Sequence, residues 1–234
     1  MDLNDIVAQL AAMPEDEKQR VIQEALNVTS GKRWLPSPGP QTEAYFSKAD
    51  ILLYGGEPGG GKTALLIGLA FNAHKRSLIM RRQYTDLANI IDYAVTVNKS
   101  RKGLNGSPPP SFVIGEGQKI EFGAAARIGD EQHWMGNPHD FIGIDEATHF
   151  AESQIRFLMG WLRSTEEGQR CRVVLATNPP LSSEGAWVVD MFAPWLDPRH
   201  PNPALPGELR WFVNDDEGKD IEVFGPDPVQ IGMR

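Results

Sequence analysis

The sequence is short of three features, and each shortage excludes a class of protein. A single cysteine, Cys171, rules out an internal disulfide. No apolar run approaches transmembrane length, and the N-terminus has acids at Asp2 and Asp5 and no apolar core of a secretory signal. Positive charge is scarce, because 23 Lys and Arg against 31 Asp and Glu leave a net charge of −8. We expect a soluble intracellular protein without a membrane partner, in which any nucleic-acid contact is a local basic patch.

Helical spacing and a proline-rich stretch mark the start of the chain. Apolar residues recur with helical spacing over residues 3–26, with a break near Met13-Pro14. Residues 30–40 are rich in Pro, Gly and Ser, which is typical of a linker. We therefore predict an N-terminal helical appendage with its linker (1–37) and a main domain (38–234). The appendage either packs on the main domain or forms a helical arm for a partner subunit.

The main domain alternates between strand-like and helix-like segments. Short apolar runs predict strands over residues 51–54, 77–80, 141–144 and 172–176 and hairpins over 112–122 and 208–224. Longer patterns predict helices over residues 41–47, 64–73, 84–97 and 155–162. This alternation predicts the α/β class, with a mostly parallel sheet and helices on both faces.

A glycine loop between a predicted strand and a predicted helix is the strongest motif. Gly56, Gly61, Lys62 and Thr63 fill the pattern G-x-x-x-x-G-K-[ST] of the phosphate-binding loop. Glycines let the backbone N–H groups wrap a phosphate, while the lysine reaches the β- and γ-phosphates and the threonine hydroxyl ligates Mg²⁺. The alternative is an ordinary glycine-rich turn. The motif predicts a P-loop NTPase that takes ATP and Mg²⁺ at Gly56, Glu57, Pro58, Gly59, Gly60, Gly61, Lys62, Thr63 and Ala64.

Two acids follow the apolar strand 141–144. At the carboxyl edge of a parallel sheet, Asp145 and Glu146 would lie beside the glycine loop. We predict that Asp145 holds the metal shell and that Glu146 orients and deprotonates the attacking water. The alternative is that both residues simply cap the following helix.

The next strand ends in Thr177-Asn178, where a γ-phosphate sensor would lie, and we predict that Asn178 hydrogen-bonds the phosphate. A strand-ending turn set by Pro179 is the alternative. Hydrolysis in related motors also uses an arginine finger, supplied in cis or in trans. The sequence does not choose among the candidates Arg81, Arg82, Arg101, Arg127, Arg156 and Arg163.

Over residues 38–195 the chain resembles the ATPase domain of the large terminase subunit of tailed phages. The residues that carry the resemblance are Pro40-Gln41, Gly55 to Thr63, Arg81-Arg82-Gln83, Asp140 to Phe150 and Ala176 to Pro179. The resemblance implies a RecA-like fold of the additional-strand type. It also implies that Gln41 reads adenine, for which the alternative is a surface polar residue, and that Thr177 and Asn178 couple hydrolysis to movement.

The resemblance further implies partners and a location. Family members translocate double-stranded DNA into a procapsid, assemble as a ring on the portal and work with a small terminase subunit, in the host cytoplasm. The basic loop Lys99–Lys102 is the best candidate for DNA contact. Two other readings stay open: another RecA-like nucleic-acid motor such as a helicase, or a nucleotide-gated assembly module with little activity alone.

The chain departs from the family pattern in two places. Many terminases carry Arg-Gly shortly before the acid strand, as a candidate trans finger, where this chain has Trp134-Met135-Gly136. Arg101 or Arg127 would then have to substitute. Family members also carry a C-terminal nuclease domain, which we expect to be absent here. We predict a solvated turn rather than a nuclease site for the acids Asp215, Asp216, Glu217 and Asp220.

Overall fold

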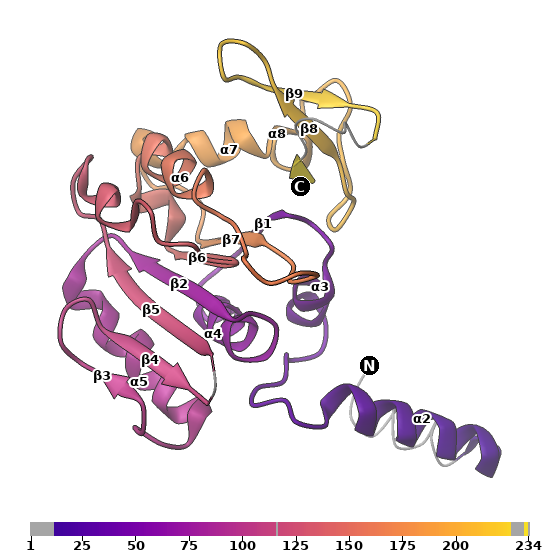
Figure 1. Ribbon diagram of the computed structural model, residues 1–234. Helices are drawn as coiled ribbons and strands as arrows, with labels where there is room; N and C mark the ends of the chain where they lie inside the picture. The colour runs from indigo at the N-terminus through magenta and orange to yellow at the C-terminus, as the bar shows by residue number, and fades with distance from the viewer. Residues whose placement is uncertain (1–11, 116, 226–231, 234) are drawn as a thin grey trace.

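The computed structural model describes residues 12–115, 117–225 and 232–233. The first described helix, α2 (Glu15–Thr29), begins just after the predicted break, whereas most of the earlier predicted helical stretch lies outside the described residues. Figure 1 shows α2 projecting away from the body of the molecule, and its described side chains are exposed apart from the half-buried Lys18. Both roles of the appendage, packing on the main domain and forming an arm for a partner subunit, stay predictions.

A seven-stranded sheet forms the centre of the main domain. Its spatial order is β1 (Ile51–Gly55), β7 (Arg172–Thr177), β6 (Phe141–Asp145), β2 (Arg76–Arg81), β5 (Gln118–Ala124), β4 (Ser111–Ile114) and β3 (Leu104–Asn105). The first five strands run parallel, β4 pairs antiparallel with β5, and β3 pairs antiparallel with β4. Because β7 lies between the strand before the glycine loop and the strand before the acids, the additional-strand P-loop fold is confirmed.

Helices cover both faces of this sheet, as predicted. The helices α4 (Lys62–Asn72) and α5 (Leu87–Asn98) pack on one face, and α6 (Glu152–Met159) and α7 (Trp187–Met191) pack on the other. Successive strand residues alternate between the two cores, since a strand has a side-chain period of two. Within β2, for example, Leu78 packs with one cluster and Ile79 with the other.

Short helices complete the domain and adjust several predicted boundaries. The predicted helix 84–97 is divided into a 3-10 turn, η1 (Tyr84–Asp86), and α5. The predicted helix 155–162 is α6, which begins three residues earlier and ends at Met159. The remaining short helices are α3 (Pro40–Phe46), η2 (Asp130–Trp134), η3 (Ala147–His149), η4 (Ser183–Gly185) and α8 (Ala193–Leu196).

A separate three-stranded sheet contains the predicted C-terminal hairpin, β8 (Trp211–Asn214) and β9 (Asp220–Val223), with β10 (Gly232–Met233) beside β8. The prediction of four solvated acids is wrong for Asp220. This residue lies in β9, and its carboxylate accepts a hydrogen bond of 2.8 Å from Nη2 of Arg156 on α6. The contact ties the small sheet to the main domain.

No helix in the described ranges combines the length and apolar character needed to cross a membrane.

Candidate active site

The glycine loop connects β1 to α4 at the carboxyl edge of the sheet. Gly56, Gly59 and Gly61 have φ values of 141°, 90° and 69°, a region that glycine adopts far more readily than other residues. The Tyr54 hydroxyl donates to the Gly60 carbonyl at 3.0 Å, and burial raises the pKa of this hydroxyl, which keeps it a donor. The loop therefore has the backbone freedom and the bracing that a phosphate cradle requires.

Gln41 lies directly behind this loop. Its side-chain nitrogen donates to the Gly61 carbonyl at 2.9 Å, and its side-chain oxygen accepts from the Ser37 N–H at 2.6 Å. Only 6% of the residue is exposed, so the surface alternative is wrong. Adenine reading by Gln41 stays a prediction, and here both ends of the amide are engaged within the chain. A Cβ added at Gly61 would overlap the Gln41 amide nitrogen. A side chain at this position is therefore disfavoured by steric overlap as well as by the positive φ.

Two residues at the start of α4 face different partners. Nζ of Lys62 donates to the carbonyls of Gly56 and Glu57 at 3.0 and 2.7 Å, so the ammonium lies over the loop that it is predicted to serve. Oγ1 of Thr63 donates to Oδ2 of Asp145 at 2.9 Å. The two predicted metal ligands, 82 positions apart in the chain, are thus in direct contact.

Asp145 and Glu146 end β6 in contrasting environments. Asp145 is 2% exposed, whereas the Glu146 side chain is 30% exposed. Glu146 has a φ of 56°, which is uncommon for a residue with a side chain and is frequent at functional sites. Although Glu146 occupies the N-cap position of η3, no side-chain capping hydrogen bond forms there. The capping alternative therefore does not explain this pair of acids.

Arg81, at the end of β2, bridges both acids. Its Nε and Nη2 donate to Oδ2 of Asp145 at 3.0 and 2.9 Å, and its Nη1 lies 3.1 Å from Oε2 of Glu146. Nδ1 of His149 lies 3.1 Å from the same Glu146 oxygen. The sequence does not select Arg81 among the six candidate arginines, because its meeting with the acids depends on the pairing of β2 with β6.

Thr177 ends β7 at the same edge, and Asn178 follows directly after it. Oγ1 of Thr177 lies 2.8 Å from Oγ1 of Thr148, which belongs to η3 directly after the acids. Oδ1 of Asn178 is buried and has no hydrogen-bond partner among the described residues. Buried acceptors are nearly always hydrogen-bonded, so we expect a ligand or a water to pair with this oxygen. The amide of Asn178 donates or accepts according to its orientation, so the side chain suits a phosphate or its water shell.

These elements surround one hollow of about 510 Å³, a size typical of small-molecule sites. Arg81, Glu146 and Asn178 line it, and so do Asn89 and Tyr93 of α5. The residues of α5 were missed by the sequence analysis, because nothing in a helical pattern signals which turn faces a distant loop. The full lining is Pro58, Gly59, Gly60, Gly61, Lys62, Thr63, Ala64, Arg81, Asn89, Ile90, Tyr93, Asp145, Glu146 and Asn178.

The other candidate arginines have different surroundings. Nη1 of Arg82 donates to the His149 carbonyl at 2.8 Å. Arg156 pairs with Glu152 and Asp220, and the hydrogen bond to Asp220 raises its pKa. The remaining three are Arg101, which is 3.7 Å from Asp92, Arg163, which lies over the Trp161 ring, and Arg127, which is exposed after β5. Of the six, Arg81 alone lines the hollow.

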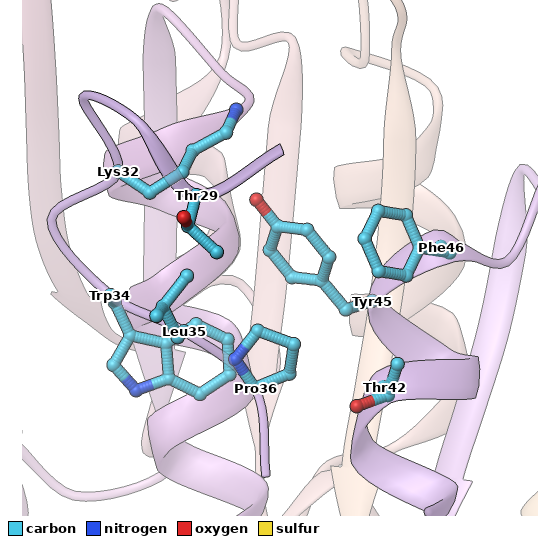
Figure 2. A pocket seen from close by; sticks show the side chains of 8 residues that line it. All are labelled: Thr29, Lys32, Trp34, Leu35, Pro36, Thr42, Tyr45 and Phe46. Carbon is cyan, nitrogen blue, oxygen red and sulfur yellow. The ribbon is translucent and has the colours of Figure 1, made fainter. Parts of the chain in front are cut away.

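A second hollow, of about 470 Å³, lies between the linker and α3. Figure 2 shows Trp34, Leu35 and Pro36 of the linker on one side and Thr42, Tyr45 and Phe46 of α3 on the other. Its lining is mostly apolar and contains one charged group, Lys32, and no carboxylate. Phosphate and metal chemistry therefore belongs to the glycine loop and not to this hollow.

Comparisons with known proteins agree with the geometry. A family model described as "Terminase large subunit, T4likevirus-type, N-terminal" matches residues 58–222, which is more than half of the chain. A comparison with proteins of curated function finds no match.

Solved structures of two phage proteins are similar over part of their length. The large terminase of a thermophilic bacteriophage is 15% identical with a TM-score of 0.42, over 64% of this chain and 39% of that one. The large terminase of bacteriophage HK97 is 12% identical with a TM-score of 0.47, over 72% and 38%. A structure of the thermophilic phage terminase in complex with ADP is 16% identical with a TM-score of 0.39, over 61% and 35%. This chain thus spans well under half the length of each.

Proposed function

Because the chain belongs to the family of terminase large subunits, we propose that it is an ATPase domain that drives double-stranded DNA into a viral procapsid. The observation that carries this proposal is the contact of 2.9 Å between Thr63 and Asp145, beside Glu146. It brings the phosphate loop and the acid pair into one site, and both are needed for hydrolysis rather than binding alone.

The residues present fit a magnesium ion. The hydroxyl of Thr63 and the carboxylate of Asp145 are hard oxygen donors, and Mg²⁺ takes few protein ligands together with waters and substrate phosphates. Within the described residues no three His, Cys, Asp or Glu side chains form a metal site, so a nucleotide would complete the shell. When bound, the ion neutralises charge on the β- and γ-phosphates.

The chain's own groups then have distinct tasks. Lys62 would leave the loop carbonyls and hold the β- and γ-phosphates, while Glu146 would orient a water and accept its proton. Asn178 would accept a hydrogen bond from the attacking water through its unpartnered oxygen and donate one to the terminal phosphate through its amide nitrogen. Thr177 would pass that state to η3 through the hydroxyl of Thr148, because the two oxygens are already in hydrogen-bond contact.

The test is phosphate release from ATP by this chain, with and without double-stranded DNA, next to Lys62→Ala. We expect Mg²⁺-dependent turnover that DNA stimulates and that the variant loses, because Lys62 is the cation that the loop directs at the β- and γ-phosphates. The control is Lys219→Ala, on the exposed turn between β8 and β9. Lys62-dependent ATP binding without turnover, with DNA present, would contradict this function and favour a nucleotide-gated assembly module.

The proposed partners follow from the same role. A packaging motor requires a ring of subunits on the portal and a small terminase subunit that selects the DNA, and it would act in the host cytoplasm. The projecting α2 is a candidate contact for a partner subunit, since it extends away from the body of the molecule (Figure 1).

The basic loop after α5 is the proposed DNA contact. It follows the carboxyl end of α5, the helix that supplies Asn89 and Tyr93 to the nucleotide hollow. Lys99 has a φ of 57°, and the Arg101 side chain is 69% exposed. This loop is therefore linked to the hollow by one helix of 12 residues.

Changing Lys99, Arg101 and Lys102 to alanine should weaken DNA binding and DNA-stimulated turnover, because contacts with the DNA phosphates are lost. Each lost contact should also reduce the steepness of log K against log salt by about 0.9. DNA binding at several salt concentrations measures this slope. The matched control changes Lys48, Arg199 and Lys219, three exposed cations elsewhere, to alanine. An unchanged slope and unchanged stimulation in the loop variant would place the DNA contact on another surface.

A further inference from the structure

Arg81 contacts Oδ2 of Asp145, a carboxylate oxygen that the predicted metal would bind. Oδ2 of Asp145 accepts three hydrogen bonds, from Oγ1 of Thr63 at 2.9 Å, from Nε of Arg81 at 3.0 Å and from Nη2 of Arg81 at 2.9 Å. A carboxylate oxygen has two lone pairs in its plane, so this atom is saturated. A cation that binds Asp145 through Oδ2 therefore has to displace the guanidinium.

The same guanidinium also engages the predicted base. Nη1 of Arg81 lies 3.1 Å from Oε2 of Glu146, the oxygen that also faces His149. Two adjacent carboxylates at a strand end repel each other, and one partly buried cation between them offsets that repulsion. Arg81 is only 19% exposed in its side chain, so water screens this contact weakly.

The geometry points to Arg81 as a placeholder cation that occupies the acid pair until the magnesium–nucleotide complex replaces it at Asp145. This inference rests on the proposed function, because it gives Arg81 a role in the same site. Arg81 is a positioning residue here. In the nucleotide-free state it keeps the Asp145 carboxylate in place for the metal and keeps Glu146 from acting as a base.

The neighbouring arginine provides a matched control. Arg82 has the same charge and the next position in the chain, but its guanidinium donates to the His149 carbonyl and, at 3.4 Å, to Oε1 of Gln154. It is not among the residues that line the hollow. Removal of Arg82 therefore changes the charge of the protein equally without exposing Asp145.

The test is the binding of Mn²⁺ to the nucleotide-free protein, followed through the electron paramagnetic resonance signal of the free ion. Mn²⁺ is the probe because it takes the same oxygen ligands as Mg²⁺. The variant Arg81→Ala should bind Mn²⁺ at least about tenfold more tightly than the wild type, since the ion no longer competes with charged hydrogen bonds. The variant Arg82→Ala should bind like the wild type.

Thermal unfolding provides a second readout. In metal-free buffer Arg81→Ala should unfold at a lower temperature than the wild type, and millimolar Mg²⁺ at constant ionic strength should restore about 3 °C. If Arg81→Ala fails to fold, Arg81→Lys replaces it, because one ammonium cannot reproduce the bidentate contact and should give an intermediate Mn²⁺ affinity.

Equal Mn²⁺ affinity in the wild type and the Arg81 variants would overturn the inference, as would an equal gain in Arg82→Ala. These measurements contain no nucleotide. A chain without ATPase activity that still shows the Mn²⁺ result would therefore contradict the proposed function and leave the role of Arg81 in place.

Discussion

The substitution Glu146→Gln should lower kcat for ATP hydrolysis by about 10²- to 10⁴-fold, because it removes the general base and keeps the shape of the side chain. Nucleotide binding should change far less, since the phosphates are held by the glycine loop, Lys62 and Thr63. The glutamine still fits the left-handed backbone as well as glutamate does, because both side chains are unbranched at Cβ. Phosphate release under saturating ATP and binding of a fluorescent ATP analogue separate the two effects.

The control for this prediction is Glu152→Gln. Glu152 lies at the start of α6, pairs with Nε of Arg156 at 2.7 Å and is outside the hollow, so its loss changes the charge equally without touching the site. If Glu146→Gln retained more than about a tenth of the wild-type kcat, another group would have to be the base. A matching loss in both variants would indicate general destabilisation instead.

The substitution Gly61→Ala should abolish measurable nucleotide binding at concentrations that saturate the wild type. Gly61 has a φ of 69°, and this left-handed conformation costs an L-residue about 1–2 kcal/mol. In addition, the new Cβ would overlap the amide nitrogen of Gln41, which is buried and bonded to the Gly61 carbonyl. Gln41 can make room for the new methyl group only by giving up its hydrogen bond to the Gly61 carbonyl, which braces the loop that holds the phosphates.

The same loop offers a matched control in Gly60→Ala. Gly60 is not among the glycines with positive φ, and a Cβ there would meet only the Glu57 carbonyl at 3.6 Å, an ordinary contact. Isothermal titration of both variants with ATP and Mg²⁺ measures the affinities, and circular dichroism checks that both are folded. Gly61→Ala with wild-type affinity, or an equal loss in Gly60→Ala, would show that the left-handed conformation and the Gln41 contact are not required.

Local signals in the sequence determined the phosphate loop, the acid strand and the class of the fold. A glycine motif between a strand and a helix has the same conformation wherever it occurs, because its geometry is set by residues close in the chain. The alternation of strands and helices fixes a parallel sheet, since parallel neighbours need crossover connections. From the sheet it then follows that Asp145 lies beside the glycine loop, because its strand ends at that edge of the sheet.

Tertiary structure decided the matters that depend on which strands are neighbours and on what packs behind the loop. Arg81 rather than five other arginines meets the acids, because β2 pairs with β6 and the strand ends align. Gln41 hydrogen-bonds the Gly61 carbonyl of the loop instead of facing solvent, because α3 packs beside α4. For Asp220 the sequence predicts a solvated turn, but the residue pairs with Arg156, 64 positions away in the chain. Contacts between residues so far apart in the chain have no local pattern, and the folded arrangement alone specifies them.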